Sequence, residues 1–298
     1  MKVPWYTVLL LETAFKVMVE IVVFVGRFDA RSLSPALREE GQSLQSPVRS
    51  TDDSPSPDYL FSQLKGVLFD LRENVDDDGG IWFDFMADCG DGFNPSYNVA
   101  RTLAQPHIDV SMGSSSFPKV LPRGKILLIG GDLCYPGPNE FNFEKRFFRV
   151  FEDAMPPPPW FRRSAISLSK PSFPIGGWDT SFCYKDKNNR QMNTYLGPSC
   201  FTVPGNHDYY DGLASYTRYI LNRDWLGGWL LPQEKSYFAL ALPNGFWLFG
   251  LDYGLSLDID LDQFKFFCFI TKKLVKDNDS IILINHEPGK FGFHRVIL

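Results

Sequence analysis

Short apolar runs that end in glycine or in a polar side chain dominate the hydrophobic pattern of the chain. Runs of this length are typical of buried strands, and they cover residues 81–86, 126–129, 201–203 and 281–284. Other stretches, in which apolar residues recur every three or four positions, predict helices over 97–104, 141–151, 213–221 and 262–276. Strands that alternate with helices predict an α/β fold.

The pattern also predicts a further helix, a hairpin and a loop. Apolar residues at three- and four-residue intervals favour a helix over 59–71. Residues 235–242 and 245–251 predict the two strands of a hairpin, turned by Pro243-Asn244-Gly245. The polar stretch 109–121 is expected to be a loop.

Changes in composition divide the chain into three regions. Residues 1–30 are mostly apolar, and residues 31–57 are rich in serine, proline and charge, which predicts a flexible linker. Residues 58–298 are expected to form one folded domain. An insertion of the length of a small subdomain interrupts this domain at about 136–198.

The N-terminal region has two interpretations. Val3 to Gly26 is long enough to span a bilayer, but Glu12, Lys16 and Glu20 interrupt it at a spacing that puts them on one helical face. One interpretation is a membrane helix whose polar face contacts other helices or the interface, and the other is an amphipathic helix docked on the domain. The chain is accordingly expected to be membrane-associated with its catalytic domain in the cytoplasm, or cytoplasmic.

Composition narrows the classes of function. The chain has 298 residues, of which 44% are hydrophobic, and this is ample for a packed core. A net charge of -5 provides no basic surface for nucleic acid. Five cysteines, an odd number, indicate reduced thiols, with a Cys183–Cys200 disulfide as the alternative.

Candidate chemistry is concentrated where the apolar runs end. Asp88, Asp132, Asn206 and His286 each follow such a run. Because open α/β sheets collect ligands at the carboxyl ends of their strands, these side chains are expected to lie together. Carboxylate, amide and imidazole groups in one place predict a metal site.

These motifs resemble those of the calcineurin-like metallophosphoesterase superfamily. In order along the chain, that family has Asp-x-His, Gly-Asp, Gly-Asn-His-Asp/Glu, a lone His and Gly-His-x-His. The matches Gly131-Asp132 and Gly205-Asn206-His207-Asp208 are the most specific. The resemblance covers residues 80–298 and implies a mixed β-sandwich flanked by helices.

The resemblance also implies a ligand set. Asp88 and Asp132 would hold one divalent ion, and Asp132, Asn206 and His286 a second; Mn, Fe and Zn suit such groups, and a single ion is the alternative. His207 corresponds to the family histidine that donates a proton to the leaving oxygen. Asp208 is a second candidate catalytic residue, which tunes His207 or instead fixes the following turn.

Two departures from the family pattern bear on activity. Gly90 stands where the family has the histidine of Asp-x-His, and Asp91 is the nearest substitute ligand. No Gly-His-x-His follows His286, so both ligand sets are short, and an uncovered sheet edge with low solubility is expected.

Two functions are therefore open. The first is metal-dependent hydrolysis of a phosphate mono- or diester. The second is an inactive or truncated relative that serves as a binding module or as a membrane-tethered interaction module.

Overall fold

A computed structural model of the chain describes residues 8–19, 64, 66–110, 120–158, 166–167, 193–255 and 258–286. The predicted linker 31–57, most of the insertion, Cys183 and the segment after His286 lie outside this part of the chain.

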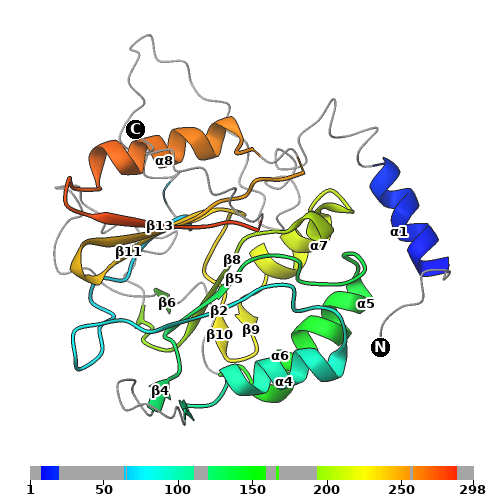
Figure 1. The fold of residues 1–298 in the computed structure, drawn as a ribbon, viewed down its shortest axis with the longest axis horizontal. Helices are drawn as coiled ribbons and strands as arrows, with labels where there is room; N and C mark the ends of the chain where they lie inside the picture. Colours follow the sequence, from blue (N-terminus) through cyan, green and yellow to red (C-terminus); the bar gives the residue numbers. More distant parts are fainter. Residues whose placement is uncertain are drawn as a thin grey trace.

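Two mixed sheets form the centre of an α/β structure (Figure 1). One sheet has the order β2-β5-β8-β10-β9 and contains β2 (Phe83–Met86), β5 (Ile126–Ile129), β8 (Ser199–Thr202), β10 (Trp229–Leu230) and β9 (Trp225–Leu226). The other has the order β1-β11-β12-β13 and contains β1 (Leu68–Asp70), β11 (Phe238–Leu242), β12 (Phe246–Gly250) and β13 (Ser280–Ile284). The α/β class and the mixed sheets agree with the sequence prediction.

The direction of the strands places the polar residues that follow them at the same end of the sheet. β2, β5 and β8 run parallel, with Met86 beside Ile129 and Ile129 beside Thr202. β5 is buried along its whole length, as expected of a central strand with a continuous apolar sequence. The residues that follow these three strands therefore lie together at the carboxyl end of the sheet.

The two sheets pack face to face through one apolar cluster. Phe201 of β8 contacts Phe238 of β11, with ring centroids 5.1 Å apart. Both sheets contribute buried residues to this cluster, which include Ile126, Leu128, Phe201, Leu230, Phe238, Leu240, Leu248 and Ile284. The strands of the two sheets thus form a sandwich.

Helices cover both outer faces of the sandwich (Figure 1). α8 (Leu261–Lys273) packs Phe266, Phe267 and Ile270 against the four-stranded sheet. Its first turn is capped by the Asp260 carboxylate, which accepts a hydrogen bond from the backbone N–H of Gln263. Helices on the other face are α4 (Phe93–Leu103), α5 (Glu140–Asn142), the π-helix η3 (Phe143–Phe148), α6 (Arg149–Ala154), α7 (Ala214–Tyr216) and the π-helix η7 (Thr217–Leu221).

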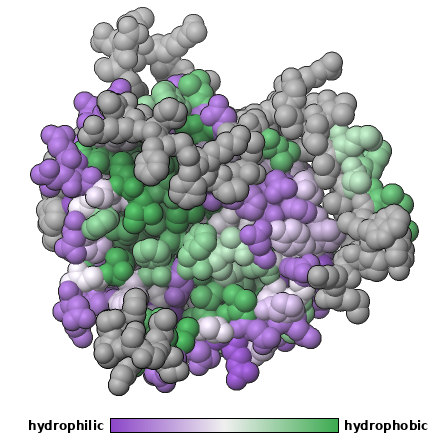
Figure 2. Space-filling model, in the orientation of Figure 1, coloured by the Kyte–Doolittle hydropathy of each residue, from purple (hydrophilic) through white to green (hydrophobic). Residues whose placement is uncertain are grey.

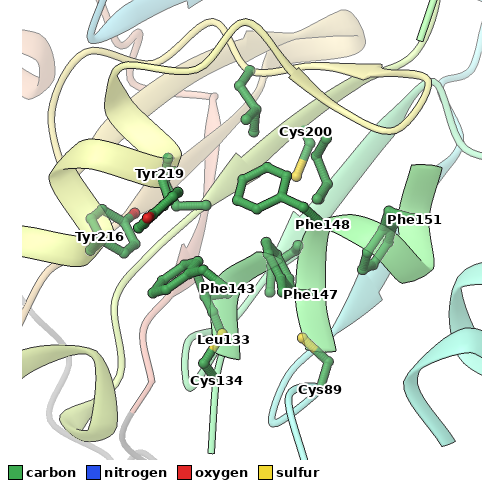
Figure 3. Packing of buried hydrophobic residues seen from close by; sticks show 14 of the residues in the cluster. Cys89, Leu133, Cys134, Phe143, Phe147, Phe148, Phe151, Cys200, Tyr216 and Tyr219 are labelled. Carbon is green, nitrogen blue, oxygen red and sulfur yellow. The ribbon is translucent and has the colours of Figure 1, made fainter. Parts of the chain in front are cut away.

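Aromatic side chains fill the space between these helices and the five-stranded sheet. Figure 3 shows the phenylalanines of η3 between Tyr219 on one side and Phe151 of α6 on the other, with Cys89, Cys134 and Cys200 around them. Phe143 stacks on Tyr219 with ring centroids 5.0 Å apart. The predicted helix over 141–151 is therefore confirmed, and its apolar side is part of the core.

Smaller elements complete the described chain. β3 (His107–Asp109) pairs with β4 (Val120–Pro122), and β6 (Ile166–Ser167) pairs with β7 (Asn193–Thr194). The 3-10 turn η8 (Pro243–Gly245) joins β11 to β12, as the hairpin prediction required. Asn244 in this turn has a positive φ of 59°, a conformation that asparagine tolerates.

Two predictions of secondary structure were wrong. The helix expected over 59–71 does not extend to residue 71, because Gly66 takes a left-handed conformation and Leu68 to Asp70 pair with β11; residues 59–63 and 65 lie outside the described residues. The loop expected over 109–121 is too long at both ends, because Asp109 belongs to β3 and residues 120–121 belong to β4; residues 111–119 lie outside the described residues. At β1 the deciding interaction is made with a strand distant in sequence.

The N-terminal region is described over α1 (Val8–Val19). Val8, Leu11, Phe15 and Met18 of this helix are exposed. None of the helices in the described part of the chain combines the length and apolar character that a membrane span requires. Membrane association through residues 1–30 stays a prediction.

Apolar side chains are exposed along one side of the sandwich. Among the described strands, β2 and β13 are edge strands of their sheets. Phe83 and Phe85 of β2, and Ile281 and Leu283 of β13, are between 37% and 58% exposed. Figure 2 shows the resulting apolar band across the face on which these strands lie. An edge strand without charged side chains, as β13 is, favours pairing with another chain.

We expect the purified chain to self-associate through this side and Leu283→Lys to reduce the association, because the new charge opposes strand pairing at the edge. Light scattering after size-exclusion chromatography measures the effect. Leu261→Lys is the matched control, because Leu261 is 64% exposed but lies on α8 rather than on an edge strand. Equal changes in both variants would show that general solubility, and not the edge, is responsible.

Candidate metal centre

The turns after β2 and β5 present two carboxylates. Asp88 lies two residues after β2 and Asp132 three residues after β5. Both have left-handed backbone conformations, with φ of 55° and 53°. Non-glycine residues in this region are uncommon and frequently occur at functional sites.

Two glycines let these turns approach the loop after β8. Gly131 has a φ of 100°, and a Cβ there would lie 2.7 Å from Nδ1 of His286. A Cβ on Gly205 would overlap Oδ1 of Asp132. Larger residues at either position would therefore push Asp132 and His286 apart.

His286 reaches the centre from the other sheet, two residues after β13. Its Nδ1 lies 2.8 Å from the carbonyl oxygen of Gly130. Because a carbonyl only accepts, Nδ1 carries the proton, and Nε2 of the neutral ring has a lone pair. This Nε2 lies 3.2 Å from Oδ1 of Asn206 and 3.5 Å from Oδ1 of Asp132.

Asn206 begins the short 3-10 helix η6 (Asn206–Tyr209) that follows β8. Its Nδ2 donates to the hydroxyl of Tyr210 at 3.2 Å, which orients Oδ1 toward His286. Three acceptors, from Asn206, Asp132 and His286, therefore converge.

The second oxygen of Asp132 faces Tyr135. The Tyr135 hydroxyl lies 2.6 Å from Oδ2 of Asp132 and 2.7 Å from Oδ1 of Asp88. Burial raises the pKa of Tyr135, and the hydrogen bonds to the two carboxylates raise it further. One hydroxyl has one proton, so it donates to only one carboxylate at a time.

Hydrogen-bond acceptors thus outnumber donors around both oxygens of Asp132. A cation can bind where several acceptor atoms converge in this way. Oxygen and nitrogen atoms of Asp88, Asp132 and His286 all lie within 4.8 Å of one another. A histidine that donates Nδ1–H to a backbone carbonyl and presents Nε2 is the usual form of a metal-binding histidine. The residues present therefore fit a divalent ion.

His207 lies beside these groups, and one nitrogen of its ring is engaged in a hydrogen bond. Its Nδ1 donates to the carbonyl oxygen of Pro136 at 2.9 Å, and its backbone N–H donates to Oδ1 of Asp132 at 3.0 Å. The ring lies between those of Tyr135 and Tyr210, with centroids 4.5 and 4.6 Å away. Its Nε2 remains 4.0 Å from Oδ2 of Asp132.

Asp208 is fully buried and has a structural place. Its carboxylate accepts hydrogen bonds from the backbone N–H of Gly205 at 2.8 Å and of Leu133 at 3.2 Å. Burial raises the pKa of Asp208 to about 8, while the hydrogen bond from Gly205 opposes this shift. The residue joins the turn after β5 to the turn after β8, a structural place that differs from the predicted one in the turn after Asp208.

We expect Asp208→Ala to lower the free energy of unfolding by about 2–4 kcal/mol, because an unsatisfied buried N–H costs about 1–3 kcal/mol. Urea denaturation measures this change. In the control Asp153→Ala, an exposed ion pair with Arg149 is lost, and a change below about 1 kcal/mol is expected. A comparably small change in Asp208→Ala would contradict the bridging role.

Asp91 and Gly90 differ in their suitability as ligand positions. Asp91 is exposed and does not belong to the group of converging ligand atoms, so the described structure gives its predicted role no support. A Cβ on Gly90 would overlap the carbonyl oxygen of Leu133. A histidine at position 90 is therefore incompatible with this backbone packing.

Tyr135 is the site residue that sequence reasoning missed. It lies three residues after Asp132, where a loop begins, and no hydrophobic period marks it. Its closeness in sequence to Gly131-Asp132 is the one feature of the sequence that could have indicated a place at the site. The structure places its hydroxyl in the position of an additional oxygen ligand.

The cysteines near the centre are buried thiols. Cys89, Cys134 and Cys200 are buried and free, and Cys268 is partly exposed and free. Burial raises the pKa of Cys89, Cys134 and Cys200. A thiol with a raised pKa is unreactive. Cys200 being free, the alternative of a disulfide with Cys183 is not supported.

Comparison of the chain with known protein families, with curated proteins and with solved structures finds no match in any of the three.

Proposed function

We propose that the chain is a metal-dependent phosphoesterase of the calcineurin-like metallophosphoesterase superfamily, which hydrolyses a phosphate mono- or diester. The observation that carries this proposal is the position of Asp132 between two sets of acceptors. One of its oxygens faces His286 and the other faces Tyr135. A carboxylate placed in this way is suited to bridge two ions.

The residues divide into two ligand sets that share Asp132. Asp88, Asp132 and Tyr135 would hold one divalent ion, and Asp132, Asn206 and His286 the other. Their mixture of oxygen and nitrogen donors suits Mn, Fe or Zn. Bound divalent ions supply Lewis acidity toward a phosphoryl oxygen and lower the pKa of water from about 15.7 to about 7.

The remaining steps belong to the side chains of the chain. The neutral amide of Asn206 adds a ligand without adding negative charge. Additional negative charge at the centre would repel a phosphate. His207 donates a proton from Nε2 to the leaving oxygen, because Nδ1 is already held by Pro136. The rings of Tyr135 and Tyr210 limit the movement of His207, so that the donor is oriented before substrate binds.

The architecture supports the same proposal. Two mixed sheets packed face to face, with helices on both outer faces, agree with the sandwich that the sequence motifs imply.

The test uses the purified full chain with para-nitrophenyl phosphate and with bis-para-nitrophenyl phosphate. Hydrolysis of either ester that requires added Mn²⁺ and stops with a chelator is the expected result. A folded chain that hydrolyses neither ester with Mn²⁺, Fe²⁺ or Zn²⁺ would overturn the proposal. Binding of Mn²⁺ without hydrolysis would instead support the alternative of an inactive relative that serves as a binding module.

A further inference from the structure

The candidate metal centre is assembled from both sheets of the sandwich. Asp88, Asp132 and Asn206 follow strands of the five-stranded sheet, whereas His286 follows β13 of the four-stranded sheet. The distance between His286 and Asn206 therefore depends on how the two sheets are held relative to each other at this end.

A buried hydrogen bond crosses between the sheets beside the centre. Tyr209 ends η6, the short helix that begins with Asn206. Its hydroxyl donates to Oδ1 of Asp252 at 2.6 Å. Asp252 lies two residues after β12, in the four-stranded sheet. Tyr209 is 3% exposed and Asp252 is fully buried.

Asp252 and His286 occupy equivalent positions on neighbouring strands. β12 and β13 run parallel, and Gly250 is paired with Ile284. Two residues further along each strand direction lie Asp252 and His286. A contact that fixes Asp252 thus also fixes the strand end from which His286 projects.

Other groups hold Asp252 in place. Its carboxylate also accepts from the hydroxyl of Ser236 and from the backbone N–H of Gly254. The fully buried side chain of Gln263 accepts from the backbone N–H of Asp252 at 3.0 Å and donates to its carbonyl oxygen at 2.8 Å. Because Gln263 belongs to α8, the backbone of Asp252 is anchored to this helix, while its carboxylate is held by Ser236, Gly254 and Tyr209.

We propose that Tyr209 and Asp252 are positioning residues, which hold His286 at the distance from Asn206 and Asp132 that a metal ion requires. This inference rests on the proposed function. Neither residue belongs to the group of converging ligand atoms. Tyr209 acts through η6 and Asp252 through the end of β12. Partners of this kind change metal affinity by about 10- to 100-fold when they are lost.

The test compares Tyr209→Phe with Tyr216→Phe. Tyr216 of α7 is equally buried, and its hydroxyl donates to the carbonyl oxygen of Thr202 in β8 and also contacts Oγ1 of Thr202 and Nε2 of Gln233. Both variants lose a buried phenol hydrogen bond, but only Tyr209→Phe loses one between the sheets. Titration calorimetry of the full chain with Mn²⁺ is expected to show an affinity lowered by about 10- to 100-fold in Tyr209→Phe. The affinity of Tyr216→Phe should stay within about threefold of the original chain. Equal affinities, or equal losses in both variants, would overturn the inference.

A second measurement needs no metal. In the original chain, nitrogen NMR shifts of His286 should report the Nδ1–H form that its hydrogen bond to Gly130 selects. Tyr209→Phe is expected to increase the Nε2–H form, and Tyr216→Phe is not. If the original chain bound no Mn²⁺, the proposed function would fail, and this measurement would still decide whether Tyr209 positions His286.

Ser236→Ala covers the case in which Tyr209→Phe does not fold. It removes the hydroxyl from the other oxygen of Asp252 and leaves Tyr209 in place. We expect the same changes in Mn²⁺ affinity and in the His286 spectrum, by a smaller factor. An unchanged affinity and spectrum in this variant would contradict the role of Asp252.

Discussion

Asp132→Asn is expected to reduce Mn²⁺-dependent hydrolysis of para-nitrophenyl phosphate by more than about 100-fold. Loss of a group that only orients a metal ligand lowers metal affinity or activity by up to about 100-fold. In Asp132→Asn the shared ligand itself changes, so a larger loss of activity is expected. The asparagine side chain has one oxygen in place of two. It therefore cannot contribute an oxygen both to the ligand set that contains His286 and to the one that contains Tyr135. The backbone should tolerate the change, because asparagine adopts the left-handed conformation that Asp132 has.

The comparison variant for this experiment is Asp91→Asn. Asp91 is an aspartate of the neighbouring turn, after β2, but it is exposed and outside the group of ligand atoms. Its replacement should leave hydrolysis and Mn²⁺ affinity unchanged. Retained hydrolysis in Asp132→Asn would show that the reaction takes place elsewhere on the chain, and a large loss in Asp91→Asn would restore Asp91 as a ligand.

His207→Ala should lower kcat by about 100- to 10,000-fold for an alkyl phosphate, the usual contribution of a general acid or base. The loss should be much smaller for para-nitrophenyl phosphate, whose leaving group needs no proton. Mn²⁺ affinity should change little, since Nε2 of His207 lies 4.0 Å from Asp132 and is not among the converging ligand atoms. Steady-state kinetics with the two esters separates these effects.

His107→Ala is the matched control for the loss of an imidazole. His107 lies on β3 and is exposed. The control should retain the rates of the original chain with both esters. Equal losses with the two esters in His207→Ala, or a large loss of Mn²⁺ affinity, would mean that His207 binds metal or supports the fold and does not act as the proton donor.

Elements with a strong local pattern could be predicted from the sequence. The apolar runs at β5 and β13 needed no knowledge of their partners, because each is continuous and is followed by glycine or by a polar residue. The hairpin of β11 and β12 was equally clear from its turn residues. Parallel pairing of β5 with β8 brings Asp132 and Asn206 together, whereas His286 reaches them from β13 of the other sheet, an arrangement that the strand pattern alone does not contain.

Other features depend on contacts that the local pattern does not contain. The apolar spacing before Asp70 resembles that of a helix, but pairing with β11 decides that β1 is a strand. Proximity in sequence favoured Asp91, whereas the orientation of its loop leaves that side chain exposed. Tyr135 enters the centre because its loop turns back on Asp88, a contact across 47 residues.

Burial of the thiols makes the chain suitable for site-directed labelling. Among the described cysteines, Cys268 on α8 is the one that is partly exposed, since Cys89, Cys134 and Cys200 are enclosed by the core. In a Cys183→Ser background, a maleimide fluorophore should attach selectively at Cys268. The dye would then sit on the helix that anchors Asp252, so its emission could report in real time on movement between α8 and the metal centre.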